Sequence, residues 1–464
     1  MRIVIDLQTC QGVSAYRGMG RYSLSLAQEM VRQGAGRGHE MWLALNDNNV
    51  ASIHTIVAAF EGALPAERIA IFSGMAPVAG MVKENEWRTR AAEFLRERFL
   101  AQLNADVVHL ASIFDGSIDE VVTSVGAGRM ELPVVITHYD LIPLLMRKEY
   151  MVQEDAERFW MKKFESLRRA PFMLAISEGT KSNAIEFIGV DPEKIVNISA
   201  AVAPMFKPRA HLPEEAQAVL GRYGIVKPFV LYVPGGYDAR KNFKHLFEAW
   251  AKLPAAIRLT HQLVIGSKSH LKEYAIVRAL MRSAGLPDED VVFTGYLPDD
   301  DLISMYSLCD LHVFPSLLEG FGLPVLEALA CGAPSLASNT SSMPEIIGRE
   351  DALMDPHNPD DIAEKITRGL TDHPYRESLR EHAVQQAAKF SWERSASLAL
   401  DALERFFPPG SARRYDRQSA EDWMAGILDE LAAIEISVEP TSLDLELLRE
   451  SVAKSASALD SLKI

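Results

Sequence analysis

The sequence predicts two doubly wound α/β domains followed by a helical extension. Short apolar segments alternate with amphipathic helical segments along residues 1–391, which is the pattern of parallel sheets covered by helices. A proline-dotted passage at residues 204–213 interrupts the alternation once and indicates a hinge. With 464 residues and 48% hydrophobic content, the chain is long enough for two or three packed domains. We place the domains at residues 1–206 and 207–391, a returning helix at 392–410, and the extension at 411–464.

The first domain opens with a strand at residues 3–7, a glycine loop and an amphipathic helix that runs to Met30. Strand, loop and helix in succession form the opening unit of a parallel sheet. Gly18 and Gly20 in the loop would let the backbone approach a phosphate or a sugar closely, although a plain tight turn explains them equally well. Further strands are expected at residues 41–45, 69–72, 107–110, 134–137 and 172–176.

Three polar residues, His138, Tyr139 and Asp140, directly follow the strand at residues 134–137. Open parallel sheets bind their ligands at the carboxyl ends of the strands. We therefore treat all three as candidate functional residues, although a histidine in this position is often structural.

The second domain begins with the strand 229–233, and a glycine turn then leads to Arg240 and Lys241 at the start of a helix. Two cations beside such a turn can clamp a diphosphate, arginine as a planar fork and lysine as a point charge. The alternative is that they are exposed turn charges. Two similar halves joined by a hinge imply a cleft between them. Further strands are expected at residues 261–265, 291–293, 311–314 and 335–337.

Residues 314–334 combine a short strand, a glycine-rich turn and a helix. Pro324 at the first helical position and Gly332 just past the last one delimit this helix. The turn would direct the Glu319 carboxylate toward the N-terminus of the helix, where partial positive charge suits an anion. We interpret the segment as a site for an anionic, hydroxyl-rich ligand. The backbone amides of Phe321, Gly322 and Leu323 and the side chain of Glu327 would face the same volume.

Composition restricts the function classes. The net charge is −15; residues 1–210 hold 23 Lys and Arg against 25 Asp and Glu, and residues 211–464 hold 25 against 38. An acidic chain without interleaved basic and aromatic residues is a poor candidate for binding nucleic acid.

Two basic clusters are either solvated helix faces or contacts for anionic lipid head groups or a lipid-linked acceptor. The clusters are Arg88, Arg90, Arg96 and Arg98, and Lys162, Lys163, Arg168 and Arg169.

No stretch of the sequence approaches the roughly 18 apolar residues that a membrane span needs. Cys10, Cys309 and Cys331 are scattered and odd in number, so neither a disulfide framework nor a metal site is indicated. We expect a cytoplasmic protein, at most peripherally bound at the inner face of the membrane.

These segments together resemble glycosyltransferase family 4. Glu319 and Glu327 match the glutamate-x7-glutamate motif of that family. The other matches occur in the family's order and spacing, so the resemblance spans roughly residues 1–406. They lie at residues 17–22, 177–178, 238–242, 293–297, 310–316, 332–334 and 344–345.

The resemblance implies a GT-B fold, with two Rossmann-like domains facing across a cleft, and retaining transfer of a hexose from a nucleotide sugar without a metal or other cofactor. By analogy, Glu319 lies beside the transferred sugar, and Glu327 binds the ribose hydroxyls. Arg240 and Lys241 neutralise the diphosphate leaving group. The amides of Phe321, Gly322 and Leu323 hold sugar hydroxyls, and Gly295, Tyr296 and Leu297 border the base.

The sequence departs from the family pattern at two places. Many members carry arginine at the position of Gly236, so the phosphate contact here would depend more on Arg240 and Lys241. The family's active-site histidine directly precedes Asp-Leu-Ile-Pro, where this chain has Tyr139. Either a local bulge turns His138 inward or Tyr139 takes that place, and we prefer His138.

Residues 299–301 contain the Asp-x-Asp pattern of metal-dependent glycosyltransferases. An apolar periodic run follows directly, so we interpret these carboxylates as capping a helix and pairing with its dipole. We predict no metal site.

The extension at residues 411–464 lies outside the resemblance, and its apolar residues recur at helical spacing. It packs onto the parent domain, forms a dimer contact, or leads into a fused or associated second transferase module. The pattern stops without an obvious helix end, which leaves truncation open.

The leading hypothesis for function is mannose transfer from GDP-mannose to an oligosaccharide or lipid-linked acceptor of the O-antigen type. Alternatives are a UDP-sugar or GDP-rhamnose transferase, a trehalose- or sucrose-type synthase, or a non-catalytic scaffold that binds nucleotide.

Overall fold

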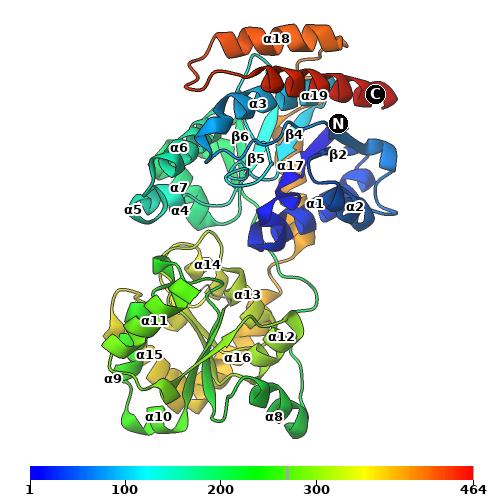
Figure 1. Cartoon of the computed structure of the whole chain (residues 1–464). Coiled ribbons are helices and arrows are strands. Elements are labelled where there is room, and N and C mark those ends of the chain that lie inside the picture. Colours follow the sequence, from blue (N-terminus) through cyan, green and yellow to red (C-terminus); the bar gives the residue numbers. More distant parts are fainter. Residues whose placement is uncertain (268–270, 463–464) are drawn as a thin grey trace. The chain divides into compact units, whose positions relative to one another are not determined.

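The computed structural model describes residues 1–267 and 271–462 and divides the chain into two compact units. Unit 1 consists of residues 1–176, 180–199 and 392–464, whereas unit 2 consists of residues 177–179 and 200–391. Each unit is a parallel sheet with helices on its faces (Figure 1). The two-domain α/β fold predicted from the alternation of apolar and amphipathic segments is therefore confirmed.

In the described part of unit 1, seven parallel strands follow the order β3-β2-β1-β4-β5-β6-β7. The order reverses between β1 and β4, and ligands of doubly wound sheets bind at this switch point. In the register, Ile5 of β1 lies between Leu43 of β2 and His109 of β4. The strands are β1 Arg2–Asp6, β2 Glu40–Asn46, β3 Ile69–Phe72, β4 Val107–Leu110, β5 Val134–His138, β6 Phe172–Ala175 and β7 Ile195–Asn197.

Most helices of unit 1 bury one face in the domain, whereas α5 has no buried residue. α3 is enclosed on both sides, because the C-terminal helices α18 and α19 pack on its outer face (Figure 1). The helices are α1 Gly18–Gly36, α2 Val50–Ala59, α3 Glu86–Gln102, α4 Ile142–Leu145, α5 Arg147–Tyr150, α6 Glu154–Arg169, α7 Glu178–Ile188, α17 Trp392–Phe406, α18 Ala420–Ala432 and α19 Ser442–Ser461.

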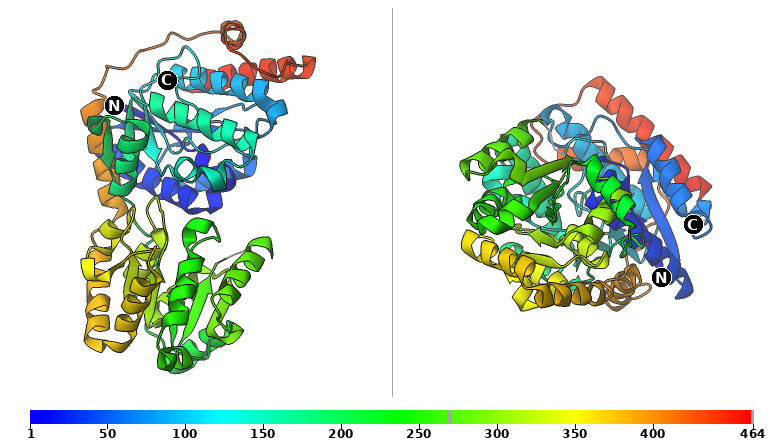
Figure 2. Two further views of the ribbon diagram at one scale, coloured as in Figure 1. Left: turned by 90° about the vertical axis from the view of Figure 1, so that its left-hand side faces the viewer. Right: turned by 90° about the horizontal axis from the view of Figure 1, so that it is seen from below.

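The extension belongs to the core of unit 1. α17 packs against α1, and an extended connection leads from α17 to α18 (Figure 2). Trp423 and Ile427 of α18 and Leu448 of α19 are fully buried in the same apolar core as the sheet. Of the three roles considered for the extension, the structure shows packing onto the parent domain. Among the described helices, none is long and apolar enough to cross a membrane.

The basic clusters of unit 1 are not simply solvated helix faces. Arg96 is 1% exposed and donates to the Asp6 carboxylate over 2.6 Å. Arg98 is 5% exposed and donates to Glu430 of α18 over 2.8 Å, and Lys163 is also buried. The interpretation as solvated faces is wrong for these three residues. The long side chains of these three residues form buried contacts within the domain, where α18 and α19 cover α3.

In the described part of unit 2, six parallel strands follow the order β10-β9-β8-β11-β12-β13, with the switch point between β8 and β11. The strands are β8 Phe229–Tyr232, β9 Gln262–Gly266, β10 Val291–Gly295, β11 Leu311–Phe314, β12 Ser335–Ser338 and β13 Leu353–Met354. The helices are α8 Pro213–Arg222, α9 Phe243–Lys252, α10 Ala255–Thr260, α11 Leu271–Ser283, α12 Asp299–Leu308, α13 Leu323–Ala330, α14 Met343–Ile347, α15 Pro359–Thr371 and α16 His373–Ala387.

Candidate active site

The loop between β8 and α9 is fixed at the switch point of unit 2 by Asn242. This residue has φ 58°, a left-handed conformation that asparagine tolerates. Its buried amide donates to the carbonyl of Pro315 over 2.8 Å and to that of Pro356 over 2.6 Å. Because Pro315 directly follows β11, the bonds hold the β8 loop beside the end of the neighbouring strand. Arg240 and Lys241, just before Asn242, are positioned there.

Glu319 accepts hydrogen bonds from both cations. Lys241 Nζ lies 2.7 Å from Oε1, and Arg240 Nη1 lies 2.6 Å from Oε2. Ser316 Oγ donates to Oε1 over 2.6 Å, and the backbone N–H of Glu319 donates to Ser341 Oγ over 3.2 Å. The structure therefore brings together the clamp and the first glutamate of the motif, which were predicted from segments about 80 residues apart.

The electrostatics of this cluster favour an ionised carboxylate. Glu319 and Lys241 are only 8% and 4% exposed. Burial alone would raise the pKa of Glu319, but Lys241 and Arg240 outweigh it and hold the pKa below its ordinary value. A second carboxylate, that of Asp238, lies 3.7 Å from Arg240, so the two cations are balanced, and an anionic ligand would bind by taking over hydrogen bonds that the carboxylates now accept.

The glycine-rich turn before α13 requires its glycine. Gly322 has φ +103°, and a Cβ at this position would lie 2.3 Å from Met343 Cε. Ser342 Oγ donates to the carbonyl of Phe321, and Ser177 Oγ donates to that of Gly320 over 2.7 Å. α13 begins at Leu323, one residue before the predicted start at Pro324. The backbone amides at residues 321–323 thus stand at a helix N-terminus, where the first N–H groups have no intrahelical partner.

Glu327 lies one turn inside α13 and accepts a hydrogen bond from the Tyr306 hydroxyl over 3.4 Å. In the loop after β10, Gly295 has φ +74°. Leu297 is 6% exposed and packs in the core of unit 2, whereas Tyr296 is 61% exposed. Of the residues expected to border a nucleotide base, Tyr296 offers an open aromatic ring and Leu297 anchors the loop.

The glycines near the start of α1 have different surroundings. Gly18 is the exposed first residue of the helix. Gly20 is buried, and a Cβ there would lie 2.4 Å from the carbonyl oxygen of Ser14 and 2.5 Å from that of Ala15. A side chain at position 20 would clash with the preceding loop, so Gly20 has a packing role. Of the two glycines, only Gly18 remains a candidate for close approach of a ligand.

The polar residues after β5 are largely internal. His138 is fully buried, and burial lowers its pKa to about 4, opposed by the backbone of Thr180, so its imidazole is neutral at neutral pH. Tyr139 Oη lies 2.7 Å from Ser23 Oγ and 3.3 Å from the carbonyl of Met19. Asp140 Oδ1 accepts the backbone N–H of Ile142 over 2.9 Å. Since the Tyr139 hydroxyl is bound to α1, we keep His138 as the preferred candidate.

A groove in unit 1 was not predicted from the sequence. It is called the polar groove below because amides and carboxylates stand among apolar lining residues such as Val13, Leu24 and Ile56. Two adjoining cavities of about 620 and 190 Å³ lie at the carboxyl ends of β1 and β2 and share Gln11, Asn49 and Asp119. Tyr16, 92% exposed, lines the larger cavity. Amides, carboxylates and an open aromatic ring are suited to hydroxylated ligands. The run Asn46-Asp47-Asn48-Asn49 directly after a strand was the signal that could have revealed the groove.

The Asp-x-Asp segment has structural partners. Residues 299–301 occupy the first turn of α12, where acidic groups suit the helix dipole. The expected side-chain cap is wrong, because the N-cap residue is Pro298. Asp300 pairs with Arg209, and Asp301 pairs with Arg222. Among the described residues, no group of three or more His, Cys, Asp or Glu side chains is arranged to hold a metal.

Two protein-family models match the chain. Residues 16–204 match the model described as Glycosyltransferase Family 4, and residues 222–386 match the one described as Glycosyl transferases group 1. The first range covers most of the sheet of unit 1, and the second covers the sheet of unit 2.

Two mannosyltransferases of Escherichia coli are similar in sequence. The chain is 34% identical over 446 residues to the serotype-specific mannosyltransferase WbdA, covering 96% of this chain and 52% of that protein. It is 30% identical over 270 residues to O-antigen chain mannosyltransferase B, covering 58% of this chain and 70% of that protein. The chain thus spans about half the length of WbdA.

Among solved structures, that of Anabaena Alr3699/HepE in complex with UDP and glucose has a similar fold. The TM-score is 0.61 at 15% sequence identity, and the match covers 87% of this chain and 100% of that one. At this level of identity the likeness concerns the fold alone.

Proposed function

The chain belongs to glycosyltransferase family 4 and has the GT-B fold, and from this premise we propose that it is a retaining mannosyltransferase. It transfers mannose from GDP-mannose to a growing polysaccharide of the O-antigen type. The choice of sugar and acceptor is supported by the similarity to the two mannosyltransferases named above. A nucleotide sugar as donor is supported by the fold shared with a protein that binds UDP and glucose.

The observation that carries the proposal is the convergence of Arg240 and Lys241 on Glu319 at the switch point of unit 2. When the glycosidic bond of a nucleotide sugar breaks, negative charge develops on the diphosphate. Cations that are already in place stabilise this charge without reorganisation. Arg240 and Lys241 bind the diphosphate, and the amides at residues 321–323 contribute the positive end of α13.

Glu319 is assigned to the transferred sugar. Its carboxylate stays ionised between two cations, so it can accept a hydrogen bond from a sugar hydroxyl once the diphosphate takes over part of the cationic charge. Glu327, one helical turn further along α13, accepts the ribose hydroxyls, and the open ring of Tyr296 borders the base. His138 and Asp140 remain candidates for the acceptor side.

The polar groove of unit 1 is assigned to the acceptor. Asn49 and Asp119 supply donors and acceptors for sugar hydroxyls, and the exposed ring of Tyr16 offers a surface for the apolar face of a sugar. Two adjoining cavities suit an oligosaccharide better than a single sugar.

A non-catalytic scaffold is the competing function from another class. Burying Lys241 and Glu319 carries a desolvation cost that a pair of apolar residues would avoid. A protein that served only as a scaffold would gain nothing from keeping this cluster, so we favour the enzyme.

The test is nucleotide release in the presence and absence of an acceptor, here octyl α-mannopyranoside. We expect turnover with GDP-mannose that exceeds the rate with GDP-rhamnose or UDP-glucose and that persists in EDTA. Asp300→Asn, which alters an exposed ion pair with Arg209 in the same unit, serves as the control and should leave the rate unchanged. Lack of turnover with every donor would exclude the enzyme proposal, whereas a loss of activity in EDTA would exclude the metal-independent mechanism.

A further inference from the structure

The connection between β4 and β5, residues 111–133, contains neither a helix nor a strand. Connections of this length without secondary structure are uncommon in compact domains and are usually functional. Its Asp119 lines both cavities of the polar groove, and its Glu120 lines the smaller one. This connection, called the groove loop below, is therefore a wall of the groove.

The groove loop is held in shape mainly by side chains of other elements. Gln8, after β1, both donates to and accepts from the backbone of Val122. Glu97 of α3 accepts the backbone N–H groups of Ala127 and Gly128. Glu430 of α18 accepts the N–H of Arg129 over 2.7 Å. A loop fixed from outside keeps its shape only as long as these side chains stay in place.

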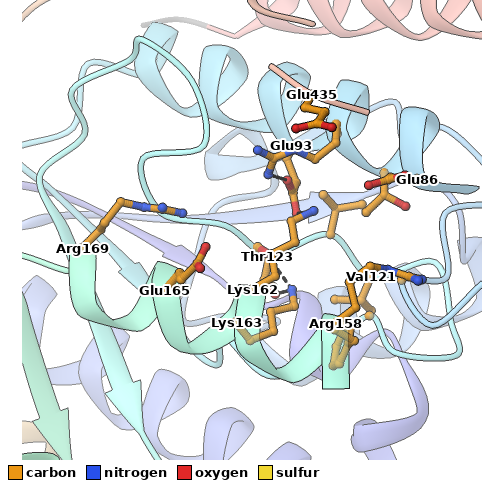
Figure 3. A pocket seen from close by; sticks show the side chains of 16 residues that line it. Glu86, Glu93, Val121, Thr123, Arg158, Lys162, Lys163, Glu165, Arg169 and Glu435 are labelled. Atoms are coloured by element: carbon orange, nitrogen blue, oxygen red, sulfur yellow. Dashed lines mark hydrogen bonds and ion pairs between the residues drawn. The ribbon is translucent and has the colours of Figure 1, made fainter. Parts of the chain in front are cut away.

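Lys163 of α6 makes hydrogen bonds of this kind near the middle of the groove loop. Its ammonium donates to the carbonyl oxygen and to the hydroxyl of Thr123, both over 2.8 Å (Figure 3). The Thr123 hydroxyl in turn donates to the carbonyl of Ile113 over 2.8 Å. Thr123 thus links the two ends of the segment 113–123, on which Asp119 and Glu120 lie. The Asp119 carboxylate also accepts the backbone N–H groups of Val13 and Val121, and the Glu120 carboxylate accepts that of Val78.

Lys163 is buried, and among the described residues no carboxylate forms a direct ion pair with it, although Glu93 and Asp115 act on it from nearby. It is 5% exposed beside a pocket of about 220 Å³, and Glu93 is occupied by Lys162 at 2.9 Å and by Arg90 at 2.8 Å (Figure 3). Burial lowers the pKa of Lys163 to about 7, with Glu93 acting in the opposite direction. The other charged groups around it are Glu86 and Arg96 of α3, Arg158, Glu165 and Arg169 of α6, Asp115 of the groove loop, and Glu435 after α18.

We propose that Lys163 is a positioning residue for acceptor binding, because it fixes the groove loop that presents Asp119 and Glu120 to the acceptor. The proposal rests on the assignment of the groove to the acceptor. Lys163 donates hydrogen bonds to neutral oxygens and lies 5.4 Å from the centre of the Phe159 ring, and a buried cation without a paired carboxylate stabilises a domain poorly compared with a methionine of similar length. What Lys163 contributes is two hydrogen bonds to Thr123, which hold the groove loop at that residue.

The test compares Lys163→Met with Lys162→Met, a neighbour of the same type that binds Glu93 rather than the groove loop. Hydrogen exchange of the backbone amides at residues 113–125 is measured first, because this readout needs no substrate. We expect faster exchange in Lys163→Met than in Lys162→Met. With octyl α-mannopyranoside as the acceptor probe, the acceptor KM should rise about tenfold in Lys163→Met, while the KM for GDP-mannose stays within about twofold.

A second variant covers the case in which Lys163→Met does not fold. Thr123→Val removes the bond to Ile113 and one bond to Lys163 but keeps the carbonyl bond, so a smaller effect in the same direction is expected. An unchanged acceptor KM and unchanged exchange in both variants would overturn the proposal while leaving the transferase assignment intact. If the unsubstituted enzyme transfers no sugar, the function in the preceding section fails, and the exchange data still decide whether Lys163 fixes the loop.

Discussion

Lys241 in unit 2 and Lys163 in unit 1 are buried to almost the same extent, but their partners differ. Lys241 faces the Glu319 carboxylate at 2.7 Å, whereas Lys163 faces a carbonyl and a hydroxyl of Thr123. Burial acts to lower the pKa of both lysines; at Lys241 the carboxylate counteracts it strongly, and at Lys163 the pKa falls to about 7. Lys241 is paired with a carboxylate, whereas Lys163 holds the neutral carbonyl and hydroxyl groups of Thr123 in place.

The difference matters for how each site responds to a ligand. Lys241 and Arg240 are held in place by the carboxylates of Glu319 and Asp238, so a diphosphate that replaces part of these contacts gains electrostatic energy there. The charges around Lys163 are mixed, because carboxylates such as Glu86, Glu93 and Glu165 line the same pocket as the cations, so an incoming anion gains less there. Variants at Lys241 should therefore affect cleavage of the glycosidic bond, and variants at Lys163 should affect binding of the acceptor.

The largest effect is expected from Glu319→Gln. The substitution keeps the shape but removes the negative charge between Arg240 and Lys241, and kcat should fall about 10²- to 10³-fold, as for other preorganised charges at a reacting centre. Rates of nucleotide release with GDP-mannose and octyl α-mannopyranoside provide the measurement. Undiminished turnover would remove Glu319 from the mechanism.

A smaller effect, on the affinity for GDP, should distinguish Lys241 from Lys163. Lys241→Met should weaken GDP binding about 10- to 100-fold, because a charge-assisted hydrogen bond to the diphosphate is lost. Lys163→Met should leave GDP affinity unchanged. Isothermal titration with GDP measures both, and equal losses in the two variants would contradict the division of roles.

The smallest effect is a pH dependence of stability. The pKa of Lys163 is about 7 in the folded chain and near 10.5 when the side chain is exposed. Between these values the unfolded chain binds more protons, so the contribution of Lys163 to the free energy of unfolding rises with pH. Below about pH 7 the cost of charging it is fully present.

Urea denaturation at pH 6.5 and pH 9.5 tests this dependence. The difference in the free energy of unfolding between the unsubstituted chain and Lys163→Met should move in favour of the unsubstituted chain at the higher pH. Lys194→Met, at an exposed position, should show no such shift. No movement, or movement in the opposite direction, would mean that Lys163 keeps its charge in the folded state.

The sequence was most informative where function depends on local segments. Glu319, Arg240 and Lys241 lie in short motifs at strand ends, and doubly wound topology brings the ends of β8 and β11 together, so the cluster could be predicted. Strands β7 and β13 were missed because they have only three and two residues, respectively, too few for a hydrophobic pattern to appear.

Other features depend on tertiary packing and could not be found in this way. Whether Lys163 is solvated or buried is decided by the groove loop, which has no periodicity of its own. The polar groove joins Gln11, Asn49 and Asp119, which lie in three separate connections. Gly20 looks like a ligand-binding glycine in sequence, and only the position of the Ser14 carbonyl shows its packing role.

The discontinuity of unit 1 has a consequence for biosynthesis. Its apolar core includes Trp423 and Leu459 together with strands from the first 200 residues, whereas nearly all of unit 2 is one continuous segment. Ribosomes deliver the chain from the N-terminus at about 5–20 residues per second. Unit 2 can therefore complete its core while unit 1 still waits for α18 and α19, and during those seconds the outer face of α3 is the surface that a nascent-chain chaperone would meet.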